Sequence, residues 1–298
     1  GLRFFGQGML GHISMVFCGK WFFKNKGKAV AVANSGYTLA EAIMPTIFVA
    51  LIGVLSWQVS WYVSIIMSIL ILASVRLLAK TERDRGSKPL KENKQVGMLE
   101  KSWKRSEMLR SWVFWAAVPG LMTSPMITTT LFFHQVHLVE IKSWDLSTYV
   151  LFIPAYSAAT LFSLYLIGYL VDKLSTKIIL PIFLFPLISG LLLLSIATSY
   201  LELLLIFILF GLSAGAYIVV YGTFFPEFFG SLYLGSVRTV GVTIMVFSSA
   251  IGPVLSGYFI DLGYLIDHQF KFFAAFSFFA SLLFLTINLS VKLPENAK

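Results

Sequence analysis

The chain has 298 residues, of which 57% are hydrophobic and 12% are charged, and its mean hydropathy is +0.82. A soluble domain carries roughly 25% charged residues, so this composition excludes an ordinary water-soluble globular domain and predicts a polytopic membrane protein. The formal net charge of +9 does not indicate nucleic-acid binding, because the cations lie between long apolar runs rather than on one soluble face.

The apolar runs are long enough to cross a bilayer as helices, since about 20 residues at 1.5 Å per residue cover roughly 30 Å of hydrocarbon. Charged residues separate runs of about 20 to 25 residues, which favours helices over the shorter strands of a membrane β-barrel. We therefore predict an all-α, polytopic membrane bundle. Its nine spans are residues 2–19, 29–54, 58–79, 111–133, 147–171, 177–198, 201–222, 236–260 and 269–291.

The distribution of Lys and Arg predicts the orientation of these spans. Nearly all of these cations fall on one set of alternating loops, whereas the other set holds only Lys142 and Lys271. Short cytoplasmic loops are enriched in Lys and Arg. We therefore expect the cation-bearing loops and the C-terminus to be cytoplasmic, in a plasma (inner) membrane, with Gly1 on the far side.

The long charged loop over residues 80–110 separates three spans from six. An internal repeat supports this division, because an ungapped offset places Gly6 on Ala214 and Pro45 on Pro253. We expect residues 1–79 to be the last three helices of an N-terminal half, 80–110 a cytoplasmic linker and 111–298 a six-helix C-terminal half. Two related six-span halves give twelve spans, so we expect three more before Gly1.

The loop from Gly168 to Lys177 contains a glycine, then Asp172 four residues later, followed by basic residues. This loop resembles a motif of the major facilitator superfamily of secondary transporters, and the resemblance extends from the superfamily's fourth span to the end of the chain. The resemblance implies a cytoplasmic gate at this loop. Two departures from the motif, Ser175 in place of the usual Gly and Thr176 in place of a basic residue, imply a weaker gate.

Other motifs resemble one branch of that superfamily. The opening Arg3-Phe4-Phe5-Gly6-Gln7-Gly8 is similar to the fourth-span motif, and the segment 21–45 is similar to monocarboxylate-type and oxalate/formate-antiporter-type members. The segment 226–261 repeats the pattern of 21–45 in the second half. This similarity implies a small organic anion as the solute. We expect no cofactor.

Glu41 lies near the middle of the second predicted span, about 20 Å along the helix from Lys28. A carboxylate at that depth costs several kcal/mol unless it is neutral, paired or hydrated. It is therefore a candidate for proton coupling, with a static partner of a basic group as the alternative. Arg3 and His12 bracket Glu41 in depth and are candidates for pairing with it. The resemblance of Arg3 to the superfamily's fourth-span arginine also implies a role in binding the solute anion or in proton coupling, and His12 is a candidate proton relay. The alternatives are an interfacial arginine and a core histidine.

Charged residues at the predicted cytoplasmic ends of helices can form ion pairs that hold one conformation. We expect a latch in which Asp172 pairs with neighbouring lysines and Glu227 pairs with Arg238. Charges that serve only membrane topology are the alternative. The candidate gate residues are Gly168, Asp172, Lys173, Lys177, Glu227 and Arg238.

Small residues and prolines within the apolar runs are candidates for close helix packing and kinks. They are Gly6, Gly8, Gly36, Pro45, Gly252, Pro253 and Gly257. The glycines from Gly6 to Gly11 also fit a dinucleotide-binding fingerprint, but no strand precedes them. His134, His137 and Glu140 could face one side of a helix and bind a metal, although polar residues at a helix end are the simpler interpretation, so we expect no metal site.

No HExxH, Walker-type, GxSxG or CxxC motif is found, so we do not expect an enzyme. We predict a monomeric secondary transporter that moves a small solute through the lipid bilayer by alternating access, coupled to an ion or proton gradient. A non-transporting receptor or scaffold and an inactive fragment are the alternatives.

Overall fold

The computed structural model describes residues 11–22, 25–84, 96–99 and 101–291. The chain folds into two compact units, and each is described separately below. Unit 1 comprises Gly1–Gly36 and Asn93–Lys298, and unit 2 comprises Tyr37–Glu92. The helix α2 (Lys26–Val54) begins in unit 1 and continues into unit 2.

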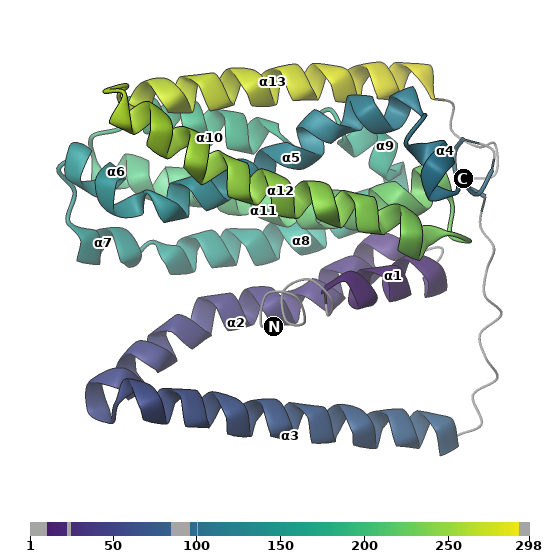
Figure 1. The fold of residues 1–298 in the computed structure, drawn as a ribbon, viewed down its shortest axis with the longest axis horizontal. Helices are drawn as coiled ribbons and strands as arrows, with labels where there is room; N and C mark the ends of the chain where they lie inside the picture. Colours follow the sequence, from purple (N-terminus) through teal and green to yellow (C-terminus); the bar gives the residue numbers. More distant parts are fainter. Residues whose placement is uncertain (1–10, 23–24, 85–95, 100, 292–298) are drawn as a thin grey trace. The chain divides into compact units, whose positions relative to one another are not determined.

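Unit 1 is a helical bundle in its described residues (Figure 1). Besides the start of α2, its helices are α1 (Gly11–Trp21), α4 (Arg105–Met108), α5 (Trp112–Phe133), α6 (Gln135–Ile141), α7 (Leu146–Val150), α8 (Ile153–Leu174), α9 (Thr176–Ile179), α10 (Phe185–Ile196), α11 (Tyr200–Phe229), α12 (Leu234–Asp261) and α13 (Ile266–Ser290).

Helix α11 lies at the centre of unit 1, where it packs on α8 and α10, while α5 packs on α12 and α13. The close approach of α8 and α11 depends on two glycines. A Cβ on Gly211 or Gly215 would overlap the backbone carbonyl of Tyr156 or Thr160 on α8. The core is largely aromatic, and its fully buried phenylalanines are Phe114, Phe224, Phe225, Phe228, Phe229, Phe270 and Phe284.

Six helical segments among the described residues are long and apolar enough to cross a membrane. They are Trp57–Leu77, Trp112–Phe133, Leu146–Leu174, Tyr200–Phe229, Leu234–Asp261 and Ile266–Ser290. The all-α class is confirmed for the described residues, but the predicted count of nine spans is not. The run 177–198 is interrupted, because α9 ends at Ile179 and α10 begins at Phe185. Pro181 and Pro186 supply no backbone N–H, and Pro186 takes a first-turn position in α10.

Unit 2 contains the rest of α2 and the helix α3 (Trp57–Asp84). The Ser56 hydroxyl accepts the backbone N–H of Val59 at 3.3 Å and so satisfies one donor at the start of α3. Along α3, Ser60, Ser64 and Ser68 each donate to the carbonyl one turn earlier. Only 6% of the apolar stretch Trp57–Leu77 of α3 is buried among the described residues.

Candidate functional site

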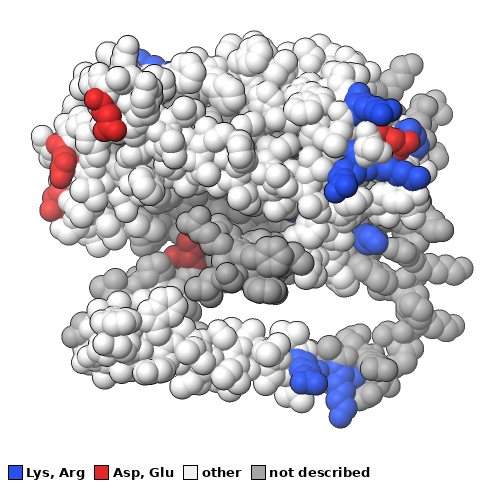
Figure 2. All heavy atoms as spheres, viewed as in Figure 1, with Lys and Arg blue, Asp and Glu red and all other residues white. Residues whose placement is uncertain are grey.

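Lysines and arginines gather at the end of unit 1 where α4 lies, as Figure 2 shows, and we call this end the cation-rich end. The exposed cations around α4 are Lys101, Lys104, Arg105 and Arg110. Three sets of contacts between segments far apart in the sequence meet near this end of the bundle.

The first set joins α8 to the start of α2. Asp172, near the end of α8, accepts the backbone N–H of Gly27 at 2.7 Å and that of Lys28 at 3.1 Å. These amides belong to the first turn of α2, where backbone donors have no partner within the helix. A carboxylate there also interacts favourably with the helix dipole. Gly27 and Gly168 allow this approach, because a Cβ on either would overlap the backbone of the other.

The second set centres on Glu227, near the end of α11, which is only 6% exposed. Its Oε2 accepts the Ser175 hydroxyl and the Thr176 backbone N–H, each at 3.0 Å, and its Oε1 lies 3.4 Å from Lys26 Nζ. Ser175 has a φ of 77°, in the left-handed region that favours glycine, which gives a physical reason for the glycine usual in this motif. The two departures from the motif, Ser175 and Thr176, therefore both take part in the Glu227 contact.

The third set attaches the linker to the end of α11. The backbone N–H groups of Met98 and Trp103 donate to the carbonyls of Glu227 at 2.7 Å and Phe229 at 2.8 Å. These carbonyls belong to the last turn of α11, where acceptors lack partners within the helix. A Cβ on Gly97 would overlap the backbone of Phe228, so the linker can lie this close only with glycine at position 97.

Glu107 organises the linker beyond that contact. Its carboxylate accepts the Lys104 backbone N–H at 2.8 Å and contacts Lys101 Nζ at 3.1 Å. The hydrogen bond from Lys104, followed by the one from Lys101, holds the pKa of Glu107 below its usual range.

The predicted Glu227–Arg238 pair is not formed among the described residues, because Glu227 bonds to Lys26, Ser175 and Thr176 instead. Arg238 is buried on α12, with its guanidinium carbon 5.1 Å from the ring centroid of Tyr221.

The two predicted lysine partners of Asp172 also lie elsewhere. Lys173 Nζ is 4.5 Å from the ring centroid of Tyr169, and Lys177 is buried next to the Ser175 hydroxyl, which accepts its backbone N–H at 3.3 Å. Asp172 therefore binds backbone amides of α2 rather than neighbouring lysines.

The structure does not test the pairing of the coupling candidates. Arg3 lies outside them, His12 is on α1 in unit 1, and Glu41 is on the part of α2 in unit 2, one turn after Tyr37. Their pairing stays a prediction.

Two of the predicted packing residues lie at a tight helix contact. A Cβ on Gly252 would meet Met126 and Thr130 of α5, and the Pro253 carbonyl lies 3.0 Å from His134 Nε2. A Cβ on Gly257 would lie 3.5 Å from the His134 ring, in ordinary van der Waals contact.

The other predicted packing residues lack such a contact or cannot be placed. Apart from its chain neighbours and the backbone of its own helix, no described atom lies within 4 Å of a Cβ built on Gly36. Helix α2 continues through Pro45, and Gly6 and Gly8 lie outside the described residues.

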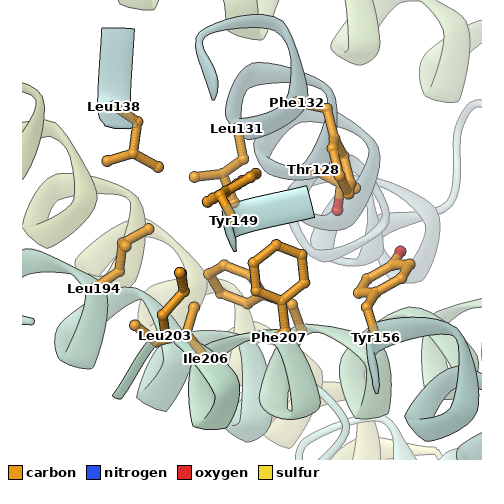
Figure 3. A pocket seen from close by; sticks show the side chains of 11 residues that line it. Thr128, Leu131, Phe132, Leu138, Tyr149, Tyr156, Leu194, Leu203, Ile206 and Phe207 are labelled. Carbon is orange, nitrogen blue, oxygen red and sulfur yellow. The ribbon is translucent and has the colours of Figure 1, made fainter. Parts of the chain in front are cut away.

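A small cavity lies among α5, α6, α7, α8, α10 and α11 (Figure 3). In Figure 3 the side chains of Leu131, Tyr149 and Phe207 point toward its centre. The cavity holds about 20 Å³, which is room for about one water molecule and too little for an organic solute. The described residues contain no group of three or more His, Cys, Asp or Glu able to hold a metal.

The site predicted from the sequence did not include Lys26, the linker contact or Tyr221. Charge could have indicated Lys26, which belongs to a basic run just before α2. Backbone amides and carbonyls carry no signal in the sequence, so the linker contact had none apart from Gly97.

No curated protein matches the chain in a sequence comparison. A family comparison matches residues 2–253, well over half of the chain, to the Major Facilitator Superfamily. The apolar helices and this match make the chain an integral membrane protein of the transporter class, as predicted. The chain belongs to the Major Facilitator Superfamily, whose members are secondary transporters.

Proposed function

We propose that this chain transports a small organic anion, of the monocarboxylate type, across the plasma membrane by alternating access driven by a proton gradient. In this proposal the cation-rich end and the C-terminus face the cytoplasm, because Lys and Arg are enriched in cytoplasmic loops. The solute class follows from the resemblance to the monocarboxylate and oxalate/formate branch.

The observation that carries the proposal is the set of contacts made by Asp172 and Glu227. They connect the start of α2, in the predicted N-terminal half, to α8, α9 and α11, in the predicted C-terminal half. Alternating access requires contacts between halves that break without unfolding either one. Hydrogen bonds from a carboxylate to a helix terminus meet this requirement, because both helices remain intact when the bonds break.

Glu41 is the proposed proton-coupling residue. Its side chain is exposed on α2, and it has no hydrogen-bond or ion-pair partner among the described residues. A charged carboxylate within the bilayer has a high free energy. Protonation of Glu41 therefore lowers the free energy of the conformation in which Glu41 is shielded from water. A proton shifts two conformations only if it binds them with different affinity.

The test is uptake of radiolabelled L-lactate into liposomes that contain the purified chain. A pH gradient should drive uptake, and Glu41→Gln should abolish this driven uptake while leaving lactate exchange at equal pH. Glu140→Gln removes an exposed carboxylate at the opposite end of unit 1 and serves as the matched control. Driven uptake that persists in Glu41→Gln refutes proton coupling through this residue, and absence of any lactate flux refutes the proposed solute class.

A further inference from the structure

Arg238 is a buried cation without an anionic partner among the described residues. It lies in the second turn of α12 and is 3% exposed, and its Nε and Nη1 atoms have no hydrogen-bond partner there. No carboxylate in the described part of the chain lies within 4.0 Å of its guanidinium. A buried charge is stable only when a counter-charge and hydrogen-bond acceptors surround it, and the described residues supply neither to Nε and Nη1 of Arg238.

The neighbouring Tyr221 has the same deficiency. Its ring lies under the Arg238 guanidinium, and its hydroxyl is buried without a hydrogen-bond partner among the described residues. Tyr217 stacks on Tyr221 with ring centroids 5.5 Å apart, yet its hydroxyl donates to the Leu121 carbonyl at 3.1 Å. Two adjacent tyrosines on α11 therefore differ, and the unsatisfied hydroxyl is the one beside Arg238.

The other groups near Arg238 cannot supply the missing negative charge. Its charge interacts with Tyr217, Tyr221 and Cys18, and His12 on α1 also interacts with it. Phenol and thiol groups are neutral near pH 7, and a histidine adds only positive charge when it is protonated. The first turn of α12 contributes a partial positive charge as well.

We propose that Arg238 and Tyr221 form a binding site for the carboxylate of a small organic anion, at the junction of α1, α11 and α12. This inference rests on the proposed function, because it makes the bound ligand the transported solute. A carboxylate has two oxygens that match the planar guanidinium, and the Tyr221 hydroxyl adds a third donor. Chloride would supply the charge but offers one acceptor atom to the fork, where a carboxylate offers two oxygens in the matching plane.

The location gives the site a role in the transport cycle. It lies between α1, of the predicted N-terminal half, and α11 and α12, of the predicted C-terminal half. The Asp172 and Glu227 contacts hold the start of α2, which follows α1 directly in the chain. Release of these contacts would therefore let α1 separate from α12 and expose Arg238. A solute anion that moves toward the cation-rich end would then bind the newly exposed Arg238 guanidinium.

The test uses acetate as the probe and the purified full chain in detergent. The midpoint of thermal unfolding is measured against sodium acetate concentration, with the bulky HEPES anion holding the ionic strength constant. Acetate should raise the midpoint in a saturable manner, and Arg238→Gln should abolish the rise. Arg110→Gln removes the same charge from an exposed position and should leave the rise unchanged.

Two conservative variants keep the test decisive if Arg238→Gln does not fold. Arg238→Lys keeps the charge but loses the fork, so the half-saturating acetate concentration should increase about tenfold. Tyr221→Phe removes one donor and should weaken acetate binding, whereas Tyr217→Phe should not. Acetate binding that is equal in wild type and Arg238→Lys overturns the assignment, and so does an equal response to chloride.

The lactate flux assay separates this inference from the proposed function. Acetate binding that depends on Arg238, in a chain without any lactate flux, supports the site and refutes lactate transport. Lactate flux with unchanged kinetics in Arg238→Gln supports transport and overturns the site.

Discussion

Two aspartates of unit 1 bind helix N-termini with the same chemistry and different consequences. Asp145 accepts the backbone N–H of Thr148 at 2.8 Å and so caps α7, the helix that directly follows it. Asp172 does the same for α2, which precedes it by 145 residues. A local cap stabilises one helix, whereas a cap supplied by a distant segment holds two segments together and can be released while both stay folded.

The two glutamates of α11 repeat this difference at opposite ends of one helix. Glu202 accepts the backbone N–H groups of Thr198 and Ser199, both at 2.8 Å, in a capping box at the start of α11. Glu227, near the end of α11, bonds instead to α9 and to Lys26 of α2. Asp172 and Glu227 at the cation-rich end therefore connect segments, although Glu107 at that end caps its own helix α4. Asp145 and Glu202 at the opposite end complete their own helices. Asp267 is an exception there, because it pairs with Lys142 at 2.9 Å.

Removing Glu227 tests this comparison with the largest expected effect. Cys18, the only cysteine of the chain, is 4% exposed on α1 and reports opening of the cation-rich end. Hydrogen bonds to charged groups contribute about 1.5 to 3 kcal/mol each, so Glu227→Ala should raise the rate of Cys18 alkylation by N-ethylmaleimide about tenfold or more. Mass spectrometry measures the modified fraction over time.

Glu202→Ala is the matched control, because it removes a glutamate from the same helix. Its alkylation rate should stay within about twofold of wild type, since a local cap contributes mainly to its own helix. Equal acceleration in both variants would show that the contacts of Glu227 have no special role in closing this end.

A smaller effect is expected from Asp172→Asn. Asparagine keeps one carbonyl acceptor for the Gly27 and Lys28 amides but loses the negative charge at the start of α2. A charge at a helix terminus contributes about 0.3 to 1 kcal/mol, so the alkylation rate of Cys18 should rise about two- to fivefold. A rate that matches wild type would mean that the charge of Asp172 does not contribute to closure.

The sequence could identify Asp172 and Glu227 but not their partners. The loop motif and the charge pattern indicated both residues, whereas the Gly27 and Lys28 amides have no side-chain signature. The expected Glu227–Arg238 pair is not formed among the described residues, because opposite charges close together in the sequence do not determine where each side chain points. Glu227 contacts α9 and Lys26, whereas Arg238 packs on Tyr221.

The fold, like the site, could be predicted from the sequence only in part. Hydropathy predicted the all-α class, because long apolar runs must satisfy their backbone groups internally in lipid. The interruption between α9 and α10 could also have been predicted, since Pro181 and Pro186 both lie within the run 177–198. The docking of Gly97 on α11 depends on backbone contacts between distant segments, and the sequence pattern does not contain them.

Asp145→Asn should have the smallest effect and completes the comparison with Asp172→Asn. Hydrogen bonds from the Ser147 hydroxyl and then from the Thr148 backbone N–H lower the pKa of Asp145. The stabilisation that comes with a lowered pKa is present above the usual pKa of aspartate, and it is lost as the pH falls through the lowered value. Asp145→Asn should therefore lower the thermal unfolding midpoint slightly at pH 7. The midpoint of this variant should also fall less on acidification than that of wild type, because the contribution of Asp145 is already absent. The rate of Cys18 alkylation should not change. Asp145 is exposed and caps only the five residues of α7, far from α1 and its Cys18 (Figure 1). Faster alkylation of Cys18 in this variant would show that a local cap at one end of unit 1 controls opening at the other. The distinction between local caps and caps that connect segments would then fail.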